Sequence, residues 1–294
     1  MWFPLALVAL VMLVARRTVE KDLSGKIDSL ALAWLQQAFA LPFIFVTLFF
    51  APFFMPGELS ANFWFWTVLY SFGCAVDLYL YFKALSLAEV SYVAPLLALA
   101  GVTTVFGSVL ILHQKPTLWG FGGAALVVAG TILVHRGKMK HVESRERNQL
   151  ALWLILILVV LRASYSNFEL WPLRESNPTT FNFYTSLLTL PMVLILTSIL
   201  RRNQAKVYWA KTVKHMRSYI YPFLFIGLTY TINLTATYQA KLLSPTAGYV
   251  TAVKSAQVVP MVLIGAWLFR EKVTKKQWYG VGLISLGLLG LGLG

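Results

Sequence analysis

The strongest constraint on this chain is a succession of long, uninterrupted apolar segments separated by short polar turns. A helix of about 20 apolar residues crosses the hydrocarbon core of a bilayer and satisfies its own backbone hydrogen bonds there. Membrane-spanning barrels instead alternate apolar and polar residues over short segments. The sequence therefore predicts an all-α, polytopic membrane protein.

Composition supports this class and excludes others. Hydrophobic residues make up 58% of the chain and charged residues only 12%, whereas soluble domains carry roughly 25% charged residues. The net charge of +14 does not indicate nucleic-acid binding, because most basic residues lie in short loops, where they set topology. The single cysteine, Cys74, excludes an internal disulfide, and no Cys/His set has zinc spacing. No metal or cofactor is predicted.

Ten spans are expected, forming two five-helix units at residues 1–140 and 150–294. The polar loop His135–Gln149 separates these units. The N-terminus lacks a basic n-region and a cleavage site, so it is predicted as a first, short span, with Arg16 and Arg17 snorkelling from its end. The spans are approximately Trp2–Ala15, Ser29–Phe50, Phe63–Leu85, Val90–Leu112, Leu118–Val134, Leu150–Trp171, Thr180–Leu200, Tyr219–Ala240, Gly248–Phe269 and Gln277–Leu293.

The two units resemble each other in the order of their features. Each has a short turn, a helix bearing proline or glycine, a charged turn and a glycine-rich helix. Because each unit holds five spans, an odd number, the second enters the membrane with the opposite orientation, as in inverted-repeat transporters. A shift of 157 positions aligns Tyr81, Leu85, Tyr92, Val93, Val105 and Lys115 with Tyr238, Leu242, Tyr249, Val250, Val262 and Lys272.

The distribution of basic residues predicts the orientation. Loops after odd-numbered spans hold 20 of the 25 Lys and Arg residues. Because basic loops stay cytoplasmic, these loops are expected inside and both termini outside.

Two segments resemble the paired signatures of a known family. KALSLAEVSYVAPLLAL (Lys83–Leu99) and AKLLSPTAGYVTAVKSAQVVPMVLIGAWLFREK (Ala240–Lys272), with the glycine-rich last helix, are similar to the EamA-like ten-helix branch of the drug/metabolite transporter superfamily. The resemblance covers nearly the whole chain as two EamA-like units. The first unit departs at His113-Gln114-Lys115, where Gln114 stands in the place of the usual acid.

The resemblance implies secondary transport of small metabolites without ATP, in a membrane of the bacterial inner-membrane type. Family members carry amino acids, nucleotide sugars, sugar phosphates, lipid-linked sugars and drugs, so the family does not name the substrate. We expect alternating access, with a site near mid-membrane between the halves, built from spans one, three, four, six, eight and nine.

Lys254 is the first candidate for that site. It lies near the start of the apolar segment Tyr249–Lys272, which is predicted as one helix with Pro260 in its middle. A lysine at that depth costs about 2.5–3.5 kcal/mol on insertion scales. It either binds an anion or gates the cavity, or it snorkels or pairs with a carboxylate.

Arg162 and Asp77 are the next candidates, each deep in a span. Arg162 shares one helix face with Ser166 and Glu169, and it serves either the substrate or a structural ion pair. Asp77 is interpreted as the only acid deep in a span. It either carries a coupling proton or neutralises Arg162 or Lys254.

The remaining candidates could line the cavity, although packing is the alternative for each tyrosine. The predicted substrate-binding set is Lys254, Arg162, Asp77, Tyr249, Tyr92, Tyr81, Tyr238 and Asn167.

An enzymatic role is not expected, because the sequence has no phosphate-cradling loop, metal-ligand cluster or Ser/His/Asp set. The expected partners are a small-molecule substrate and the lipid bilayer. Coupling to a proton or counter-substrate, and a homodimer, stay open. The alternative function is export of neutral amino acids or drugs, with the charged residues only in structural pairs.

Overall fold

The computed structural model describes residues 1–87, 99–136, 145–260, 262–263 and 274–293, and every regular element in these ranges is a helix. Short 3₁₀ turns occur at Leu48–Phe50 (η1), Pro56–Glu58 (η2) and Arg202–Gln204 (η3). The α-helices are α1 (Trp2–Ser24), α2 (Ser29–Thr47), α3 (Ala61–Leu87), α5 (Leu99–Leu112), α6 (Leu118–Arg136), α7 (Arg145–Phe168), α8 (Leu170–Glu175), α9 (Pro178–Leu200), α10 (Ala205–Ser218), α11 (Ile220–Leu243), α12 (Ala247–Ser255) and α14 (Lys275–Leu293).

Five of the described helices are long and apolar enough to cross a membrane, so the predicted all-α, multi-pass class is confirmed. They cover Trp2–Ser24, Ser29–Phe50, Ala61–Ala84, Leu152–Glu175 and Pro178–Leu200. Two shorter apolar helices cover Thr103–Leu112 and Leu118–Val134. The number of ten spans stays a prediction, and Tyr92 and the Phe269–Lys272 segment lie outside the described residues.

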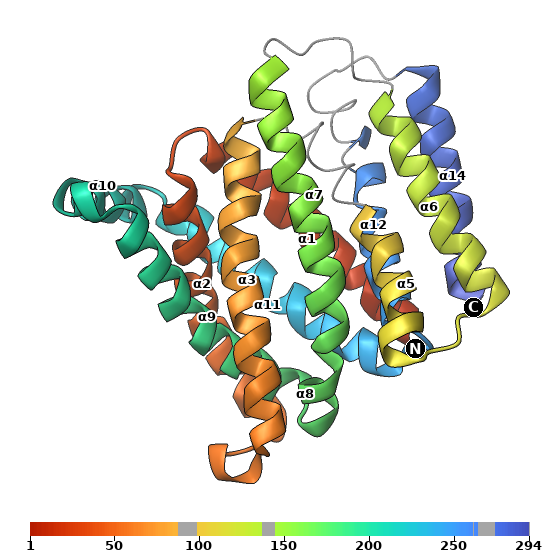
Figure 1. Ribbon diagram of the computed structural model, residues 1–294, viewed down its shortest axis with the longest axis horizontal. Helices are drawn as coiled ribbons and strands as arrows, with labels where there is room; N and C mark the ends of the chain where they lie inside the picture. Colours follow the sequence, from red (N-terminus) through yellow and green to blue (C-terminus); the bar gives the residue numbers. More distant parts are fainter. Residues whose placement is uncertain (88–98, 137–144, 261, 264–273, 294) are drawn as a thin grey trace.

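The helices form one bundle in which the two halves of the sequence interlock (Figure 1). α1 packs against α11, and in return α3 packs against α7. Likewise α2 packs against α11 while α9 packs against α3. Each half therefore completes the packing of the other, and polar side chains from both halves meet in the middle of the bundle.

The glycine-rich helices α6 and α14 lie side by side (Figure 1). A Cβ on Gly130 would lie 2.6 Å from the carbonyl oxygen of Gly280, and one on Gly123 would lie 2.6 Å from that of Gly287. Because the later glycine of one helix meets the earlier glycine of the other, the helices are antiparallel. Because backbones can approach this closely only where the residues are small, these glycines form the packing surface between the two helices.

The prediction that the first span ends near Ala15 is wrong. α1 continues to Ser24, so Arg16 and Arg17 lie inside the helix instead of snorkelling from its end. Arg17 is buried, and Arg16 forms an ion pair with Glu20, four residues on, at 3.0 Å. A hydropathy profile places the end of a span at such charges. An ion pair between residues four apart on a helix compensates them, so the helix can continue.

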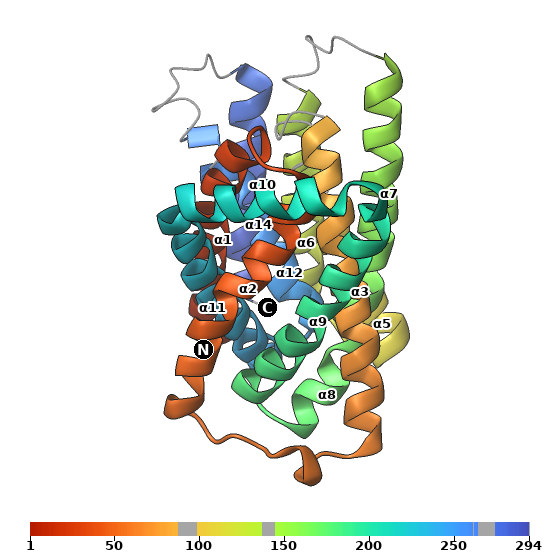
Figure 2. The same ribbon diagram turned by 90° about the vertical axis from the view of Figure 1, so that its left-hand side faces the viewer.

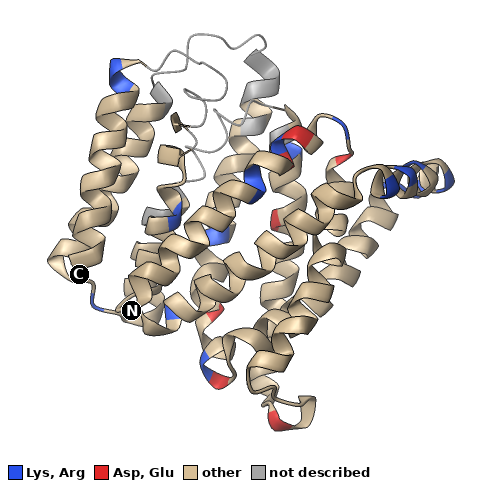
Figure 3. Ribbon diagram, turned by 180° about the vertical axis from the view of Figure 1, so that it is seen from behind, with Lys and Arg blue, Asp and Glu red and all other residues tan. Residues whose placement is uncertain are grey.

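The basic stretch expected as a loop between spans seven and eight contains another helix. α10 runs across the bundle, at a steep angle to the long helices (Figure 2). Trp209 on its inner face packs against Trp34 of α2, with ring centroids 5.6 Å apart, and Thr212 is buried. Lys and Arg residues, coloured blue, occur along its length (Figure 3). With 14 residues α10 is too short and too polar to be predicted as a membrane span, which explains why this stretch was expected to be a loop.

The segment beginning at Tyr249 is not one continuous helix. α12 ends at Ser255, and Ala256 and Gln257 form a turn in which the Gln257 N–H donates to the Lys254 carbonyl at 3.2 Å. Pro260 has no N–H, and its ring displaces the carbonyl four residues earlier, at Ala256. The helix therefore breaks after Ser255, one residue beyond Lys254.

The bundle has two distinct ends, because α9 runs from one to the other. At the α10 end, Arg201 pairs with Asp28 in the α1–α2 turn. At the η2 end, Asn177 Nδ2 donates to the Pro52 carbonyl at 2.6 Å, and the Ser60 N–H donates to Glu175 at 2.7 Å.

Candidate functional site

A pocket of about 190 Å³ lies inside the bundle, between the two halves of the chain. Residues of α1, α3, α5, α7, α11 and α12 line it, together with Gln36 of α2. These six helices correspond to the spans from which the sequence analysis expects the site. Its ionisable lining consists of Arg16, Arg17, Asp77, Arg162, Glu169, Lys241 and Lys254, with Cys74, Tyr70, Tyr81, Tyr165, Tyr230 and Tyr238.

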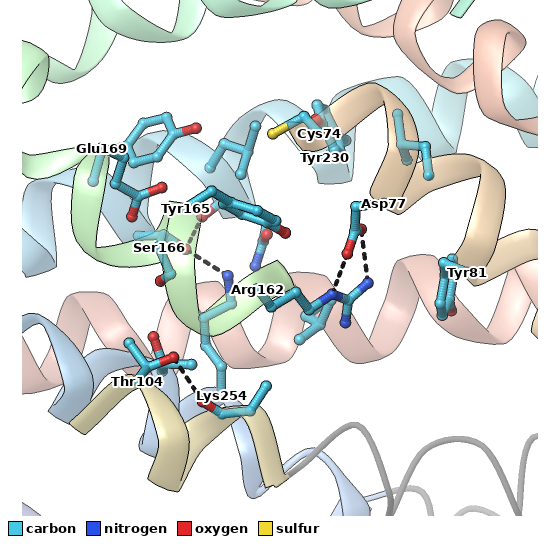
Figure 4. A pocket seen from close by; sticks show the side chains of 18 of the residues that line it. Cys74, Asp77, Tyr81, Thr104, Arg162, Tyr165, Ser166, Glu169, Tyr230 and Lys254 are labelled. Atoms are coloured by element: carbon cyan, nitrogen blue, oxygen red, sulfur yellow. Dashed lines mark hydrogen bonds and ion pairs between the residues drawn. The ribbon is translucent and has the colours of Figure 1, made fainter. Parts of the chain in front are cut away.

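Arg162 of α7 and Asp77 of α3 face each other in this pocket (Figure 4). Arg162 Nε donates to Asp77 Oδ1 at 2.6 Å, and Nη2 donates to Oδ2 at 2.9 Å. Two parallel charge-assisted bonds of this kind fix both side chains. Of the two roles left open for Asp77, this geometry favours neutralisation of Arg162.

Tyr81 connects this pair to α1. Its ring lies beneath two guanidinium groups, with the Arg17 carbon 5.2 Å and the Arg162 carbon 5.5 Å from the ring centroid. Its hydroxyl donates to Glu20 Oε2 at 3.3 Å. The negative face of an aromatic ring attracts cations. Tyr81 therefore helps to fix the positions of two positively charged groups, the Arg17 guanidinium of α1 and the Arg162 guanidinium of α7.

The interpretation of Asp77 as the only acid deep in a span is wrong, because Glu20 and Glu169 are also buried. Glu20 is 1% exposed, and Glu169 is 3% exposed. Arg16, Arg17 and Glu20 are not among the predicted site residues, because the first span was expected to end near Ala15. The i, i+4 spacing of Arg16 and Glu20 was the available signal that the helix continues.

Lys241 also lies beyond the predicted end of its span, Ala240. It lies in the last turns of α11, is buried, and pairs with Glu169. Its ammonium also donates to Ser166 Oγ at 2.6 Å and to the Ser166 carbonyl at 3.1 Å. Ser166 and Glu169 share the predicted polar face of α7, but no pattern in the sequence links them to Lys241.

Lys254 lies in the last turn of α12, beside the break in the helix. Its ammonium donates to Thr237 Oγ1 of α11 at 3.0 Å. Among the described residues no carboxylate forms an ion pair with it. Discontinuous helices in transporters line substrate and ion sites with their freed backbone groups, and Lys254 occupies such a position.

Tyr238 closes the pocket toward the η2 end. Its hydroxyl lies 2.9 Å from that of Tyr70, which precedes Asp77 by two turns of α3. Phe181 packs edge-on against Tyr238, with centroids 5.1 Å apart. Lys241 and Glu169 also line the pocket, and their ion pair is a second contact between helices in its wall.

Two other predicted residues lie outside the pocket lining. Tyr249 is fully buried, and its hydroxyl accepts from the Thr117 N–H at 2.7 Å, next to Gly120 at the start of α6. Asn167 donates to the Ala163 carbonyl of its own helix at 2.7 Å and to the Thr104 carbonyl of α5 at 3.4 Å. The structure therefore brings together Lys254, Arg162, Asp77, Tyr81 and Tyr238.

Gln114, which stands where the family usually has an acid, also has a structural role. Its side-chain oxygen accepts from the N–H of Ala247, the first residue of α12, at 3.1 Å. It thereby joins the α5–α6 turn to the start of the helix that carries Lys254.

The fold and pocket define a class of protein. An all-helical, multi-pass bundle with a pocket lined by charged side chains between its two halves is an integral membrane protein with a polar interior cavity. In the described residues no group of three or more His, Cys, Asp or Glu side chains could hold a metal ion.

Comparison with known proteins gives the family. The model of the EamA-like transporter family matches residues 1–136 and 149–293, and the chain belongs to that family. It is a membrane transporter of the drug/metabolite type. A crystal structure of another protein has TM-score 0.72 at 13% identity, covering 99% of this chain and 98% of that chain, and shows the fold alone. No curated protein matches the sequence.

Proposed function

We propose that this protein is a secondary transporter that moves a small polar or anionic metabolite by alternating access, with the central pocket as its substrate site. The single observation that carries this is the enclosed pocket in which charged side chains from both halves converge. Charges inside a membrane protein are costly and mark solute pathways.

The proposed architecture is ten spans in two inverted five-helix repeats, residues 1–140 and 150–294. The reciprocal packing of α1 on α11 and of α3 on α7 supports it. So does the antiparallel contact of α6 with α14. Repeats related by an axis in the membrane plane produce pairs of equivalent contacts of this kind.

Lys254 is proposed as the group that binds the anionic part of the substrate. Within the described residues its ammonium donates to the Thr237 hydroxyl, and it lies at the helix break. Arg162 orients the substrate while Asp77 balances its charge, since the two are joined by two bonds. Tyr81 and Tyr238 form the walls.

The η2 end is proposed as the closed side of the transporter. The Tyr70–Tyr238 contact and the Lys241–Glu169 pair join α3 to α11 and α7 to α11 between the pocket and that end. Release toward the η2 end then requires both contacts to separate, with the two halves moving relative to each other.

The proposed location is a membrane of the bacterial inner-membrane type, with the α10 end in the cytoplasm. Bases concentrate at this end of the described chain, on the α1–α2 turn, the end of α9 and α10 (Figure 3). Basic segments remain on the cytoplasmic side during insertion.

A second candidate is export of neutral amino acids or drugs, with charges serving only as structural pairs. The Arg162–Asp77 and Lys241–Glu169 pairs favour it. Under this alternative, Lys254 would be unimportant for substrate.

The test is counterflow in proteoliposomes that contain the purified full-length protein. A carrier exchanges labelled for unlabelled metabolite with no net chemical change, whereas an enzyme yields a product. Lys254→Ala is expected to abolish counterflow of an anion, and Lys211→Ala, on the exposed face of α10, is the matched control. Unchanged anion counterflow in Lys254→Ala would remove Lys254 from the site.

A further inference from the structure

The charges in and around the pocket do not balance. Five basic side chains face it, namely Arg16, Arg17, Arg162, Lys241 and Lys254. Three of them have a carboxylate partner each: Glu20 for Arg16, Asp77 for Arg162, and Glu169 for Lys241. Within the described part of the chain, this leaves an excess of two positive charges.

Arg17 is one of the two cations without a carboxylate. It is 7% exposed, and its Nε is buried without a hydrogen-bond partner among the described atoms. Its guanidinium rests on the Tyr81 ring. Glu20, the nearest acid along α1, is already occupied by Arg16 and by the Tyr81 hydroxyl. A buried donor left unsatisfied is costly, so the pocket holds Arg17 ready for an acceptor.

Lys254 is the other cation without a carboxylate, and it approaches the pocket from the opposite half of the chain. It comes from α12, whereas Arg17 comes from α1, which packs against α12. Within the described residues, the hydrogen bond of its ammonium is to a neutral hydroxyl, that of Thr237. Two uncompensated cations from two elements thus face one enclosed space.

We propose that the substrate is a small dianion, with two negative charges that Arg17 and Lys254 neutralise together. This inference rests on the proposed function for the pocket's role in transport, but it adds the charge of the substrate and assigns Arg17 to the site. A dicarboxylate and a phosphate monoester share this chemistry. Arginine suits it because its planar fork donates two hydrogen bonds to a carboxylate or phosphate.

Paired probes test the charge directly. The dicarboxylate arm compares succinate with its monoamide, and the phosphate arm compares methyl phosphate with dimethyl phosphate, at pH 8 and constant ionic strength. Binding to the purified full-length protein is measured by thermal stabilisation. In at least one arm, the dianion is expected to bind roughly 10- to 100-fold more tightly than the matched monoanion. The arm that shows this preference identifies the source of the charge.

Variants then assign the preference to residues. Arg17→Gln and Lys254→Gln are each expected to remove it, whereas Arg17→Lys retains the charge and keeps most of it. Arg202→Gln, an exposed base on η3, is the control for net charge. Equal binding of dianion and monoanion in both arms, or a preference that survives Arg17→Gln, overturns the proposal.

The binding and counterflow measurements distinguish failure of the proposed transport function from failure of the dianion inference. If dianions bind as expected but counterflow never occurs, the proposed function is wrong and the dianion site remains. If a neutral or singly charged solute undergoes counterflow that Arg17→Gln leaves unchanged, transport is confirmed and the dianion inference is wrong.

Discussion

Arg162 and Asp77, 85 residues apart in the sequence, are joined by two hydrogen bonds of 2.6 and 2.9 Å across α7 and α3. Their side chains are only 19% and 9% exposed. Because α7 belongs to the second half of the chain and α3 to the first, this pair connects the two halves in the wall of the pocket.

Replacing one member of this ion pair is expected to destabilise the protein more than replacing both members together. Asp77→Asn or Arg162→Gln alone leaves one charge buried, which costs about 3 kcal/mol. The double variant Asp77→Asn/Arg162→Gln should lose clearly less than the sum of the two. Thermal denaturation of the purified variants measures this coupling. Strictly additive losses would show that the two side chains do not stabilise each other.

The same double variant separates the two roles of Asp77. If Asp77 only balances the charge of Arg162, removing both charges together should leave counterflow measurable while either single variant abolishes it. A carboxyl that carries the coupling proton cannot be replaced in this way. Loss of pH-driven accumulation in the double variant, with exchange retained, would therefore identify Asp77 as the proton carrier.

The sequence could predict the bundle and part of the site because both depend on local patterns. Long apolar segments indicated most helices, and the depth of Arg162, Asp77 and Lys254 within them marked these residues as costly in lipid. None of these needed knowledge of which helices are neighbours.

The rest of the site depends on tertiary contacts that no local pattern shows. In the sequence Arg16 and Arg17 indicate the end of a span, because two adjacent charges are costly in a membrane. In the structure Glu20 compensates the charge of Arg16, and the ring of Tyr81, on another helix, contacts Arg17. Lys241 looked like a loop base, because its partner Glu169 is 72 residues away in the sequence. Hydropathy averages therefore shortened α1 and α11 where buried ion pairs extend them.

The α6–α14 contact predicts unequal effects of similar glycine substitutions. Gly130→Val places a side chain against the Gly280 carbonyl, 2.6 Å from its Cβ, and should cost about 1–3 kcal/mol. Gly122→Val is the control, since nothing lies within 4 Å of a Cβ there. Melting temperature and gel-filtration profile of the purified variants test this. Equal melting of the two variants would contradict the antiparallel contact.

Tyr249 is expected to affect stability rather than substrate binding. Tyr249→Phe removes the acceptor of the Thr117 N–H and should cost about 1 kcal/mol. Tyr238→Phe, which removes a hydroxyl at the pocket wall, should instead alter counterflow. Melting and counterflow are measured on both variants. An unchanged melting temperature with impaired counterflow in Tyr249→Phe would restore Tyr249 to the substrate site.

The distribution of bases over the two ends predicts the orientation in the membrane. In a Cys74→Ala background, a cysteine at Lys211 on α10 should react with a membrane-impermeant thiol reagent only after the cells are opened. A cysteine at Gly57 in η2 should react in intact cells, and its Cβ meets nothing within 4 Å, so it is tolerated. Both positions are exposed, which makes their intrinsic reactivity comparable. Labelling of Lys211→Cys in intact cells, with Gly57→Cys protected, would invert the proposed orientation and place the Tyr70–Tyr238 and Lys241–Glu169 contacts on the cytoplasmic side.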